Sequence, residues 1–447
     1  MLDRITFGMN NDAPKTTSQP DSIAERMRAD WNERAREDPH FYVAFGSHHQ
    51  DEENFLATGR EVVGTIEFEL RRFPPEVDRS TLRALEIGCG PGRLMKPLSR
   101  NFAEIHGVDV SDEMIRLARE RLRGIPHAHV HVVSNPGLAE FGDRSFDLIY
   151  SYAVYQHIPS REVVLEYMRA TRRLLTPGGI FRGQFNSLPQ AGDPNTWIGV
   201  TFSADEIRAF TRANGLQLLA LESAGTQYMW TTWRKPALAR TLPPTTIRRI
   251  TSAHRSEPAV PNSGRHAAIA VWTVNLPEEA DLNSLDVRID GASGVISYIG
   301  APDSARLQQV NVALPQGVRT GLAPVELALN GASLCKPAVL RVMPAGPLTP
   351  RVMAVTDGIN LVEEYRSTTG SLKVHIEEVL RPESIRATVA GRPVRDLTFL
   401  LVDPLPPRYS VDFFVPEGLG PGRYPLQLFV GQRALVPVEI EVAGKRD

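Results

Sequence analysis

Apolar and polar positions follow two different patterns along this chain of 447 residues. In residues 1–236, short apolar runs of strand length alternate with stretches in which apolar residues recur at helical spacing. In residues 237–447, short alternating runs are separated by Gly and Pro. The first pattern predicts an α/β domain, and the second predicts all-β structure.

The second part of the chain repeats itself. The stretch Val310–Gly331 corresponds to Val411–Gly431. The turn residues of the first copy recur in the second, Pro315, Gly317 and Gly321 as Pro416, Gly418 and Gly422. A repeat of about 100 residues built of short strands has the size of one immunoglobulin-like β-sandwich. We therefore predict one sandwich at residues 245–346 and a second at 348–443.

Three glycines follow the first apolar strand of the N-terminal part. In LRALEIGCGPGR they stand at alternate positions, Gly88, Gly90 and Gly92, and glycine lets the backbone turn sharply and approach a ligand closely. A nicotinamide dinucleotide site would need a glycine in place of Arg93. Glu86 would repel a pyrophosphate, whereas it can hold a cationic amino group of a methionine moiety, directly or through water. The spacing therefore argues against a nicotinamide oxidoreductase.

A second carboxylate stands at the end of the next strand. The strand AEIHGVDV ends at Asp109, where a carboxylate can accept both hydroxyls of an adenosine ribose. Together, Glu86–Gly92 and Asp109 resemble the class I S-adenosylmethionine-dependent methyltransferase family. Further matches follow in the family's order. Ser134–Pro159 resembles its third acidic loop and fourth strand, and Arg172–Phe185 resembles its Pro-Gly-Gly turn and fifth strand.

The resemblance covers roughly residues 60–236 and implies a multidomain chain. This part is expected to form an α/β Rossmann-like domain with a seven-stranded, mostly parallel sheet. Two all-β immunoglobulin-like sandwiches, which resemble TIG-type domains, would follow it. The expected strands lie near residues 84–88, 104–110, 128–133, 145–151, 179–186, 216–222 and 227–234. Ligands of such sheets bind beyond the carboxyl ends of the strands.

The cofactor that the resemblance implies is S-adenosyl-L-methionine. Met114 stands where the family often packs an apolar side chain on adenine. Cys89 lies inside the glycine loop, where small residues of any kind occur, so we do not expect a catalytic thiol. By their places in the family's motifs, the cofactor-binding candidates are Glu86, Gly88, Cys89, Gly90, Gly92, Asp109, Val110, Met114, Asn135, Pro136, Leu138 and Ser151.

One position departs from the family's pattern. The family usually has an acidic residue where Asn135 stands, to accept the adenine amino group, and the next backbone N–H binds the ring. Asn135 can still accept through its side-chain oxygen, but Pro136 has no N–H to donate. Two interpretations follow. Either the affinity for the cofactor is lowered, or the adenine is held by Leu138 and its neighbours in a shifted loop.

The polar residues after the fourth and fifth strands are candidates for chemistry. His157 is the candidate base, because an imidazole with its ordinary pKa of about 6.5 can abstract a proton near neutral pH. The alternative role, ordering of its loop, explains the residue equally well. Tyr155 and Gln156 could line the same pocket. Gln184 and Asn186 end the fifth strand and are candidates for substrate contact or for turn formation.

Residues 1–59 predict a helical segment that closes over the site as a lid. Ser22 and Glu25 form a capping box ahead of apolar residues at helical spacing. Tyr42 is the candidate pocket residue of this segment, and a helix packed on the core is the alternative. His48, His49 and Asp51 do not predict a metal site, because adjacent side chains diverge in direction.

Composition and charge narrow the classes of partner that the protein is expected to bind. The formal charge is -2, and no basic tract stands out, so there is no clear nucleic-acid or membrane signal. With two cysteines, no apolar leader and no long apolar run, a cytoplasmic protein is expected. The predicted function is methyl transfer to an oxygen or nitrogen of a small molecule, lipid or glycan. The alternative is a non-catalytic scaffold that binds a protein or glycan partner through its sandwiches.

Overall fold

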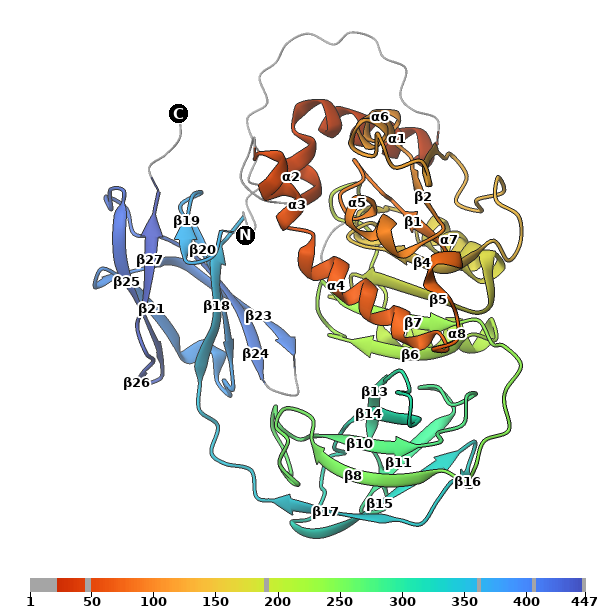
Figure 1. Ribbon diagram of the computed structural model, residues 1–447. Coiled ribbons are helices and arrows are strands. Elements are labelled where there is room, and N and C mark those ends of the chain that lie inside the picture. The colour runs from red at the N-terminus through yellow and green to blue at the C-terminus, as the bar shows by residue number, and fades with distance from the viewer. Residues whose placement is uncertain (1–21, 45–49, 189–192, 360–362, 404–406, 444–447) are drawn as a thin grey trace.

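The computed structural model describes residues 22–44, 50–188, 193–359, 363–403 and 407–443. The chain forms an N-terminal α/β domain and two β-rich units that follow it in an arc (Figure 1). The first β-rich unit lies below the α/β domain in this view, and the second lies beside it.

The N-terminal domain is built on a sheet whose first strands are parallel. Its strand order is β3-β2-β1-β4-β5-β7-β6, with β7 antiparallel to both of its neighbours. The strands are β1 (Arg83–Ile87), β2 (Glu104–Asp109), β3 (Ala128–Val132), β4 (Phe146–Ser151), β5 (Leu175–Phe185), β6 (Gln217–Glu222) and β7 (Met229–Arg234). All seven predicted segments are strands, although β5 begins before the predicted Pro-Gly-Gly turn.

Helices cover both faces of this sheet. Leu148 and Ile149, neighbours on β4, belong to two different apolar clusters because successive strand residues point to opposite faces. The first face packs on α7 (Arg161–Leu174) and α8 (Ala204–Ala213). The second packs on α4 (Arg60–Glu69), α5 (Met95–Leu98) and α6 (Asp112–Arg121), with short 3-10 turns at Leu70–Arg72, Arg79–Thr81 and Ser99–Asn101.

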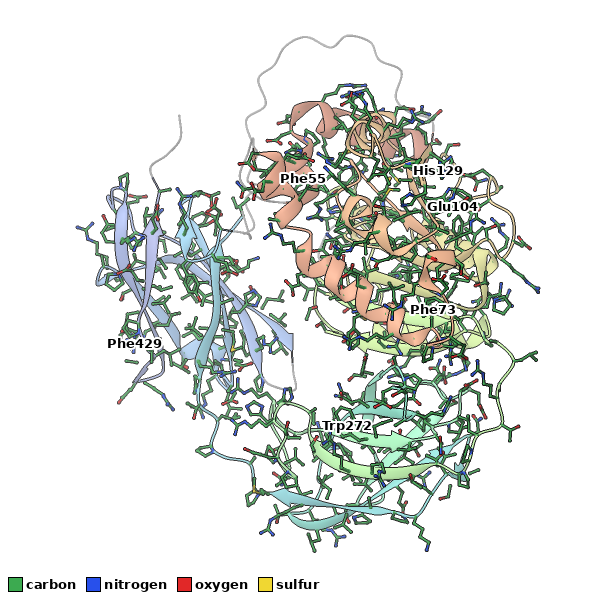
Figure 2. The ribbon with its side chains drawn as sticks, in the orientation of Figure 1. Phe55, Phe73, Glu104, His129, Trp272 and Phe429 are labelled. Atoms are coloured by element: carbon green, nitrogen blue, oxygen red, sulfur yellow. The ribbon has the colours of Figure 1, made fainter. Side chains whose placement is uncertain are left out.

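The sequence predicted a sheet of seven strands, but the sheet continues beyond β6. Tyr298 of β13 pairs with Ala220 of β6, and the sheet continues through β13-β14-β10-β8 to a total of 11 strands. The N–H of Leu282 also donates to the carbonyl of Leu218, at 2.7 Å. Figure 2 labels His129 on β3 near one end of this sheet and Trp272 on β10 near the other. The first sandwich therefore covers the edge that β6 would otherwise expose.

The two C-terminal units each pack one sheet on another. In the first unit, one sheet contains β13 (Val295–Ile299), β14 (Leu307–Ala313), β10 (Ala268–Val274) and β8 (Thr246–Ser252). The facing sheet contains β9 (Ala259–Pro261), β11 (Leu285–Ile289), β12 (Ala292–Ser293), β15 (Gly321–Leu329), β16 (Ala332–Ser333) and β17 (Ala338–Met343). Val271 and Val310 from one sheet and Val287 and Leu327 from the other are fully or almost fully buried in one cluster.

The second unit repeats this arrangement. Its first sheet contains β18 (Arg351–Asp357), β20 (Ser371–Glu377), β24 (Arg408–Phe414) and β23 (Arg395–Asp403). Its second sheet contains β19 (Arg366–Ser367), β27 (Val438–Val442), β25 (Gly422–Val430), β21 (Ile385–Val389), β22 (Arg392–Pro393) and β26 (Arg433–Ala434), with a 3-10 turn at Pro382–Ser384. Glu377, which is fully buried, joins the units because it pairs with Arg265 of the first sandwich.

The N-terminal helices lie across the carboxyl ends of β1 and β2. They are α1 (Ile23–Glu37), α2 (Pro39–Ala44) and α3 (Glu52–Ala57). The predicted capping box between Ser22 and Glu25 is present. Arg28 of α1 binds Asp112 at the start of α6 with two hydrogen bonds, of 2.7 and 2.6 Å. Asn32 accepts from the hydroxyl of Ser111, the residue that caps α6. These bonds fix α1 beside the pocket described next.

Candidate active site

A pocket lies at the carboxyl ends of β1, β2 and β4, beneath α1 and α2. Its empty volume is about 840 Å³ with the open solvent at its mouth included. Of the residues that the sequence proposed, the lining includes Tyr42, Glu86, Gly88, Cys89, Gly90, Asp109, Val110, Met114 and His157. The structure thus brings these residues together from five separate segments of the chain.

The glycine loop is held in a conformation that needs glycine. Gly88 has φ of +71°, and a Cβ placed there would lie 2.3 Å from a methyl carbon of Val154. The N–H groups of Gly88 and Cys89 donate to the carbonyl of Val108 at 2.8 and 3.0 Å, which ties the loop to β2. Burial raises the pKa of the Cys89 thiol, so this thiol stays protonated. The loop thus offers backbone rather than side chains to the pocket.

Asp109 stands at the end of β2 with both carboxylate oxygens facing backbone donors. Its Oδ2 accepts from the N–H of Gly90 and its Oδ1 from the N–H of Ser111, each at 2.9 Å. Burial raises its pKa to about 6, and the backbone hydrogen bonds oppose that rise. At neutral pH the group is therefore mainly ionised and can still accept hydrogen bonds from a ligand.

Glu86 is a second buried carboxyl group in the pocket. Only 3% of the residue is exposed, and Oε2 accepts from the hydroxyl of Tyr150 at 2.9 Å. Burial raises its pKa to about 8. The guanidinium of Arg93, which also lines the pocket and is 5% exposed, opposes that rise. An incoming ammonium group would favour the ionised form of Glu86.

Arg93 is the charged pocket residue that sequence reasoning missed. Its Nη1 donates to the hydroxyl of Thr58 at 2.7 Å, while its buried Nε has no hydrogen-bond partner. A buried guanidinium beside a buried carboxyl group suits a ligand that carries both an ammonium and a carboxylate. The sequence offered one signal, a cation directly after the last glycine of the loop, which was used only to exclude a dinucleotide.

Five of the sequence candidates do not line the pocket. Gly92 packs under α6, and Ser151 donates to the carbonyl of Ile87. The side-chain oxygen of Asn135 accepts from the N–H of Gly137 at 2.7 Å, inside its own loop. Leu138 is fully buried in the core. Pro136 is likewise absent from the pocket lining, and neither interpretation of the adenine loop is decided by the placement of these residues.

Gln184, at the end of β5, belongs to a series of buried, hydrogen-bonded side-chain amides near the pocket. Its Oε1 accepts from the N–H of Ala153 at 2.9 Å, and its Nε2 donates to the carbonyl of Gln227 at 2.6 Å. Two backbone groups therefore fix which way this amide points. Its Nε2 also donates to Oε1 of Gln156 at 3.2 Å. The Gln156 amide nitrogen is thereby turned toward its neighbour in the chain, His157.

His157 lies in the short turn Tyr155–His157 with both ring nitrogens near polar groups. Its Nδ1 lies 2.9 Å from the carbonyl oxygen of Trp197, which can only accept, so Nδ1 carries the hydrogen. Its Nε2 lies 3.2 Å from the amide nitrogen of Gln156 and accepts. Burial lowers the pKa of His157 to about 4. At neutral pH the ring is neutral and is a weaker base than the sequence argument assumed.

The helical segment supplies aromatic side chains to the pocket mouth. Trp31 of α1 meets the ring of His157 edge-on at 5.5 Å, and Tyr42 of α2 meets that of Trp197 at 6.0 Å. The hydroxyl of Tyr42 donates to Glu37, and its pKa is raised to about 12, chiefly by burial. Tyr42 therefore contributes a neutral hydroxyl and an apolar ring.

Within the part of the chain that the structure describes, no three His, Cys, Asp or Glu side chains are grouped so as to hold a metal ion. His48 and His49 lie outside the described residues. No described helix is both long and apolar enough to cross a membrane.

Part of the chain is similar to known methyltransferases. Residues 85–181 match a family model described as a methyltransferase domain. The ubiquinone biosynthesis O-methyltransferase of Roseobacter denitrificans is 31% identical over 173 residues, which are 38% of this chain and 64% of that protein. The enzyme of the same name from Ruegeria pomeroyi is 33% identical over 123 residues, 27% of this chain and 46% of that protein. The chain thus spans less than two thirds of these curated relatives.

Solved structures are similar to about half of the chain. Geranyl diphosphate C-methyltransferase from Streptomyces coelicolor is 15% identical, with a TM-score of 0.36, over 48% of this chain and 100% of that one. Magnesium protoporphyrin IX methyltransferase from Synechocystis has the same values. The family match and the curated relatives indicate a methyltransferase domain that includes residues 85–181.

Proposed function

We propose that this chain transfers a methyl group from S-adenosylmethionine to an oxygen or nitrogen atom of a small molecule, lipid or glycan. The observation that carries the proposal is the convergence of the glycine loop, Glu86 and Asp109 on one pocket. When bound, S-adenosylmethionine supplies a methyl group activated by a sulfonium. The residues of the chain have to bind it, align the acceptor and exclude water, and alignment alone can contribute about 7–11 kcal/mol at best.

The cofactor roles proposed for individual residues follow from their chemistry. Asp109 accepts hydrogen bonds from the ribose hydroxyls, and Met114 packs on the adenine. Glu86 binds the ammonium group and Arg93 the carboxylate of the methionine moiety. Among the other candidates, Gly88, Cys89, Gly90 and Val110 contribute backbone at the pocket wall, and Gly92, Asn135, Pro136, Leu138 and Ser151 support the loops behind it.

His157 and Tyr42 are proposed to contact the methyl acceptor, because both line the pocket and neither belongs to the cofactor loops. A histidine with a pKa of about 4 accepts a hydrogen bond but is a weak base at neutral pH. The accepting atom is therefore one that needs little help from a base, such as a neutral amine or an acidic hydroxyl.

The remaining parts of the chain have a place in the same proposal. We divide it into a lid (1–59), the methyltransferase domain (60–236) and two TIG-type immunoglobulin-like sandwiches (245–346 and 348–443). Both cysteines are unpaired, which fits a reducing compartment such as the cytoplasm.

The proposal is tested by supplying the full chain with S-adenosylmethionine and a fractionated extract of small molecules. We expect S-adenosylhomocysteine to form with one or a few fractions, and a methylated product to appear in mass spectra of the same fractions. Cofactor binding without turnover in any fraction would favour the alternative, a scaffold that acts through its sandwiches.

Cofactor affinity is expected to rise with pH between pH 6 and 7.5. Glu86, with a pKa of about 8, is protonated there in the free protein and must ionise to bind an ammonium group. Asp109, with a pKa of about 6, adds to the effect only near the lower limit. Each pH unit below 8 therefore weakens binding by up to about tenfold.

Calorimetry at pH 7 in two buffers of different ionisation enthalpy measures this effect directly. We expect the intact chain to release about one proton on binding S-adenosylmethionine. The Glu86→Gln variant should bind more weakly at pH 8 and release almost none. Proton release that is equal in the two proteins would show that Glu86 does not ionise on binding.

A further inference from the structure

A cavity between the two sandwiches is lined by several cationic side chains. Arg265 comes from the loop before β10 of the first sandwich, whereas Arg351 of β18 and Arg408 of β24 come from the second. Among the described residues that line the cavity, Glu377 on β20 is the one acidic residue. The cavity opens to solvent, so a dissolved ion can enter it.

Glu377 gathers the three arginines around one carboxylate. Its Oε1 accepts from Nε of Arg351 at 2.7 Å and also from Arg265, and its Oε2 accepts from Nη2 of Arg408 at 3.2 Å. Arg265 also lies beside Glu378, with 3.5 Å between its Nε and Oε1 of that residue. Three guanidinium groups therefore face two carboxylates, and one positive charge is left over within this cluster of described residues.

Two residues of the lining have a buried nitrogen without a hydrogen-bond partner. These nitrogens, within the described part of the chain, are Nε of Arg408 and Nδ1 of His266. The guanidinium Nε always carries a hydrogen, and the imidazole Nδ1 carries one in one of its two neutral tautomers. A buried polar atom without a partner destabilises the folded chain. A ligand that accepts hydrogen bonds from these residues would be stabilised by them.

We propose that this cavity binds a phosphate group, either inorganic phosphate or the phosphate of a small phosphomonoester. The planar guanidinium groups of Arg351 and Arg408 match the spacing of phosphate oxygens. Because these oxygens point in several directions, one phosphate can accept from arginines on two strands and from His266 together. A carboxylate, whose two oxygens lie in one plane, can meet fewer of these donors.

A phosphate bound here would join the two sandwiches. Arg265 and His266 belong to the first sandwich, and Arg351 and Arg408 belong to the second. The ion pair of Arg265 with Glu377 already crosses this boundary, and a shared phosphate adds a second link of the same kind. The site gives the pair of sandwiches a ligand of its own and does not depend on the proposed methyl transfer.

Calorimetric titration of the full chain with inorganic phosphate tests the proposal. Sodium chloride holds the ionic strength constant, because salt screens exposed charges. We expect saturable binding with one site and a dissociation constant below about 1 mM. Acetate, the carboxylate control, should bind at least tenfold more weakly. Glycerol 3-phosphate distinguishes the two sources: equal or tighter binding of the ester assigns the site to a phosphomonoester, and binding of phosphate alone assigns it to the free ion.

His266→Phe is the most discriminating variant. It keeps an aromatic ring against His254, whose ring centroid lies 5.2 Å away, and it removes a nitrogen that has no partner in the described structure. The variant should therefore fold as the intact chain does. We expect it to bind phosphate at least tenfold more weakly, which corresponds to about 1.4 kcal/mol. A residue with a merely structural role would show no such loss.

A second variant and a control complete the test. Arg408→Gln leaves Arg265 and Arg351 on Glu377 and should also weaken phosphate binding at least tenfold. Arg423→Gln, altered at a side chain of β25 that is 73% exposed, should bind phosphate as the intact chain does. Circular dichroism checks that each variant is folded.

Three results would overturn the phosphate site. The first is no saturable binding of phosphate or of its ester by the intact chain. The second is equal phosphate affinity in the intact chain, His266→Phe and Arg408→Gln, because the ion would then bind elsewhere. The third is binding of acetate as tight as that of phosphate, which would show a general attraction of anions instead of a phosphate site.

Discussion

A chain that ends at residue 236 is expected not to fold, whereas a chain that ends at residue 346 keeps a folded methyltransferase domain. The first truncation removes β13, the strand that pairs with β6. It exposes the edge of the sheet and the buried side chains Leu218 and Leu221, which belong to one core with the first sandwich. The second truncation keeps β13 in place and removes the second sandwich, with Glu377, the partner of Arg265.

Hydrogen bonds across this boundary account for the size of the effect. Arg208 of α8 donates to the carbonyls of Leu282 and Ile296, at 2.7 and 2.9 Å. Arg72, 8% exposed, donates to the carbonyl of Ile299 at 2.7 Å. A buried donor left without its partner costs ~1–3 kcal/mol, and more if charged. Several such losses together amount to a large part of the ~5–15 kcal/mol that stabilises a domain.

Circular dichroism and thermal unfolding of chains 1–236, 1–346 and 1–447 test this expectation. We expect no cooperative transition for the shortest chain and closely similar midpoints for the methyltransferase domain in the other two. A chain 1–236 that unfolds cooperatively at the temperature of the full chain would show that the first sandwich is an independent appendage.

Replacing Gly88 by alanine is expected to weaken cofactor binding by 100-fold or more. The added Cβ would lie 2.3 and 2.7 Å from the two γ-carbons of Val154, and valine is stiff at χ1. The backbone φ of +71° adds strain of about 1–3 kcal/mol for a non-glycine residue. The loop must therefore shift, and the pocket wall shifts with it. Calorimetric titration with S-adenosylmethionine measures the loss.

A second substitution separates the two causes. Val154→Ala removes both γ-carbons, so the Gly88→Ala/Val154→Ala double variant should recover part of the affinity and keep the loss that belongs to φ. Gly64→Ala is the matched control, because Gly64 lies in α4 and a Cβ there meets nothing within 4 Å. It should bind normally and be more stable by up to about 1 kcal/mol. Equal affinities in all three variants would contradict the role of the loop.

The sequence predicted the pocket better than it predicted the sheet. Glycines at alternate positions and a carboxylate at a strand end are local patterns, so Gly88, Gly90 and Asp109 could be located without a structure. The extension of the sheet by β13 is not local, because the pairing of Tyr298 with Ala220 joins residues far apart in the sequence. Nothing in the apolar run of β6 distinguishes a free edge from a paired one.

Roles that depend on hydrogen-bond partners were also beyond the sequence. The residue type of His157 suggested a base, but its partner Trp197 lies far away in the sequence, and its neighbour Gln156 is oriented by the distant Gln184. Asn135 has a local partner instead, because its side-chain oxygen accepts from the N–H of Gly137 in the same loop. Arg93 became a candidate only when its burial beside Glu86 was known. Charge and burial together, rather than residue type, define this part of the site.

The central claim is that Asp109 and the glycine loop bind S-adenosylmethionine, and one titration tests it most directly. The full chain, an Asp109→Ala variant and an Asp143→Ala control, altered at a carboxylate that is 72% exposed, are titrated calorimetrically at pH 7.5. We expect saturable binding with one site in the intact chain and the control, and none in Asp109→Ala. Equal binding by all three proteins, or no binding by the intact chain, would contradict the account.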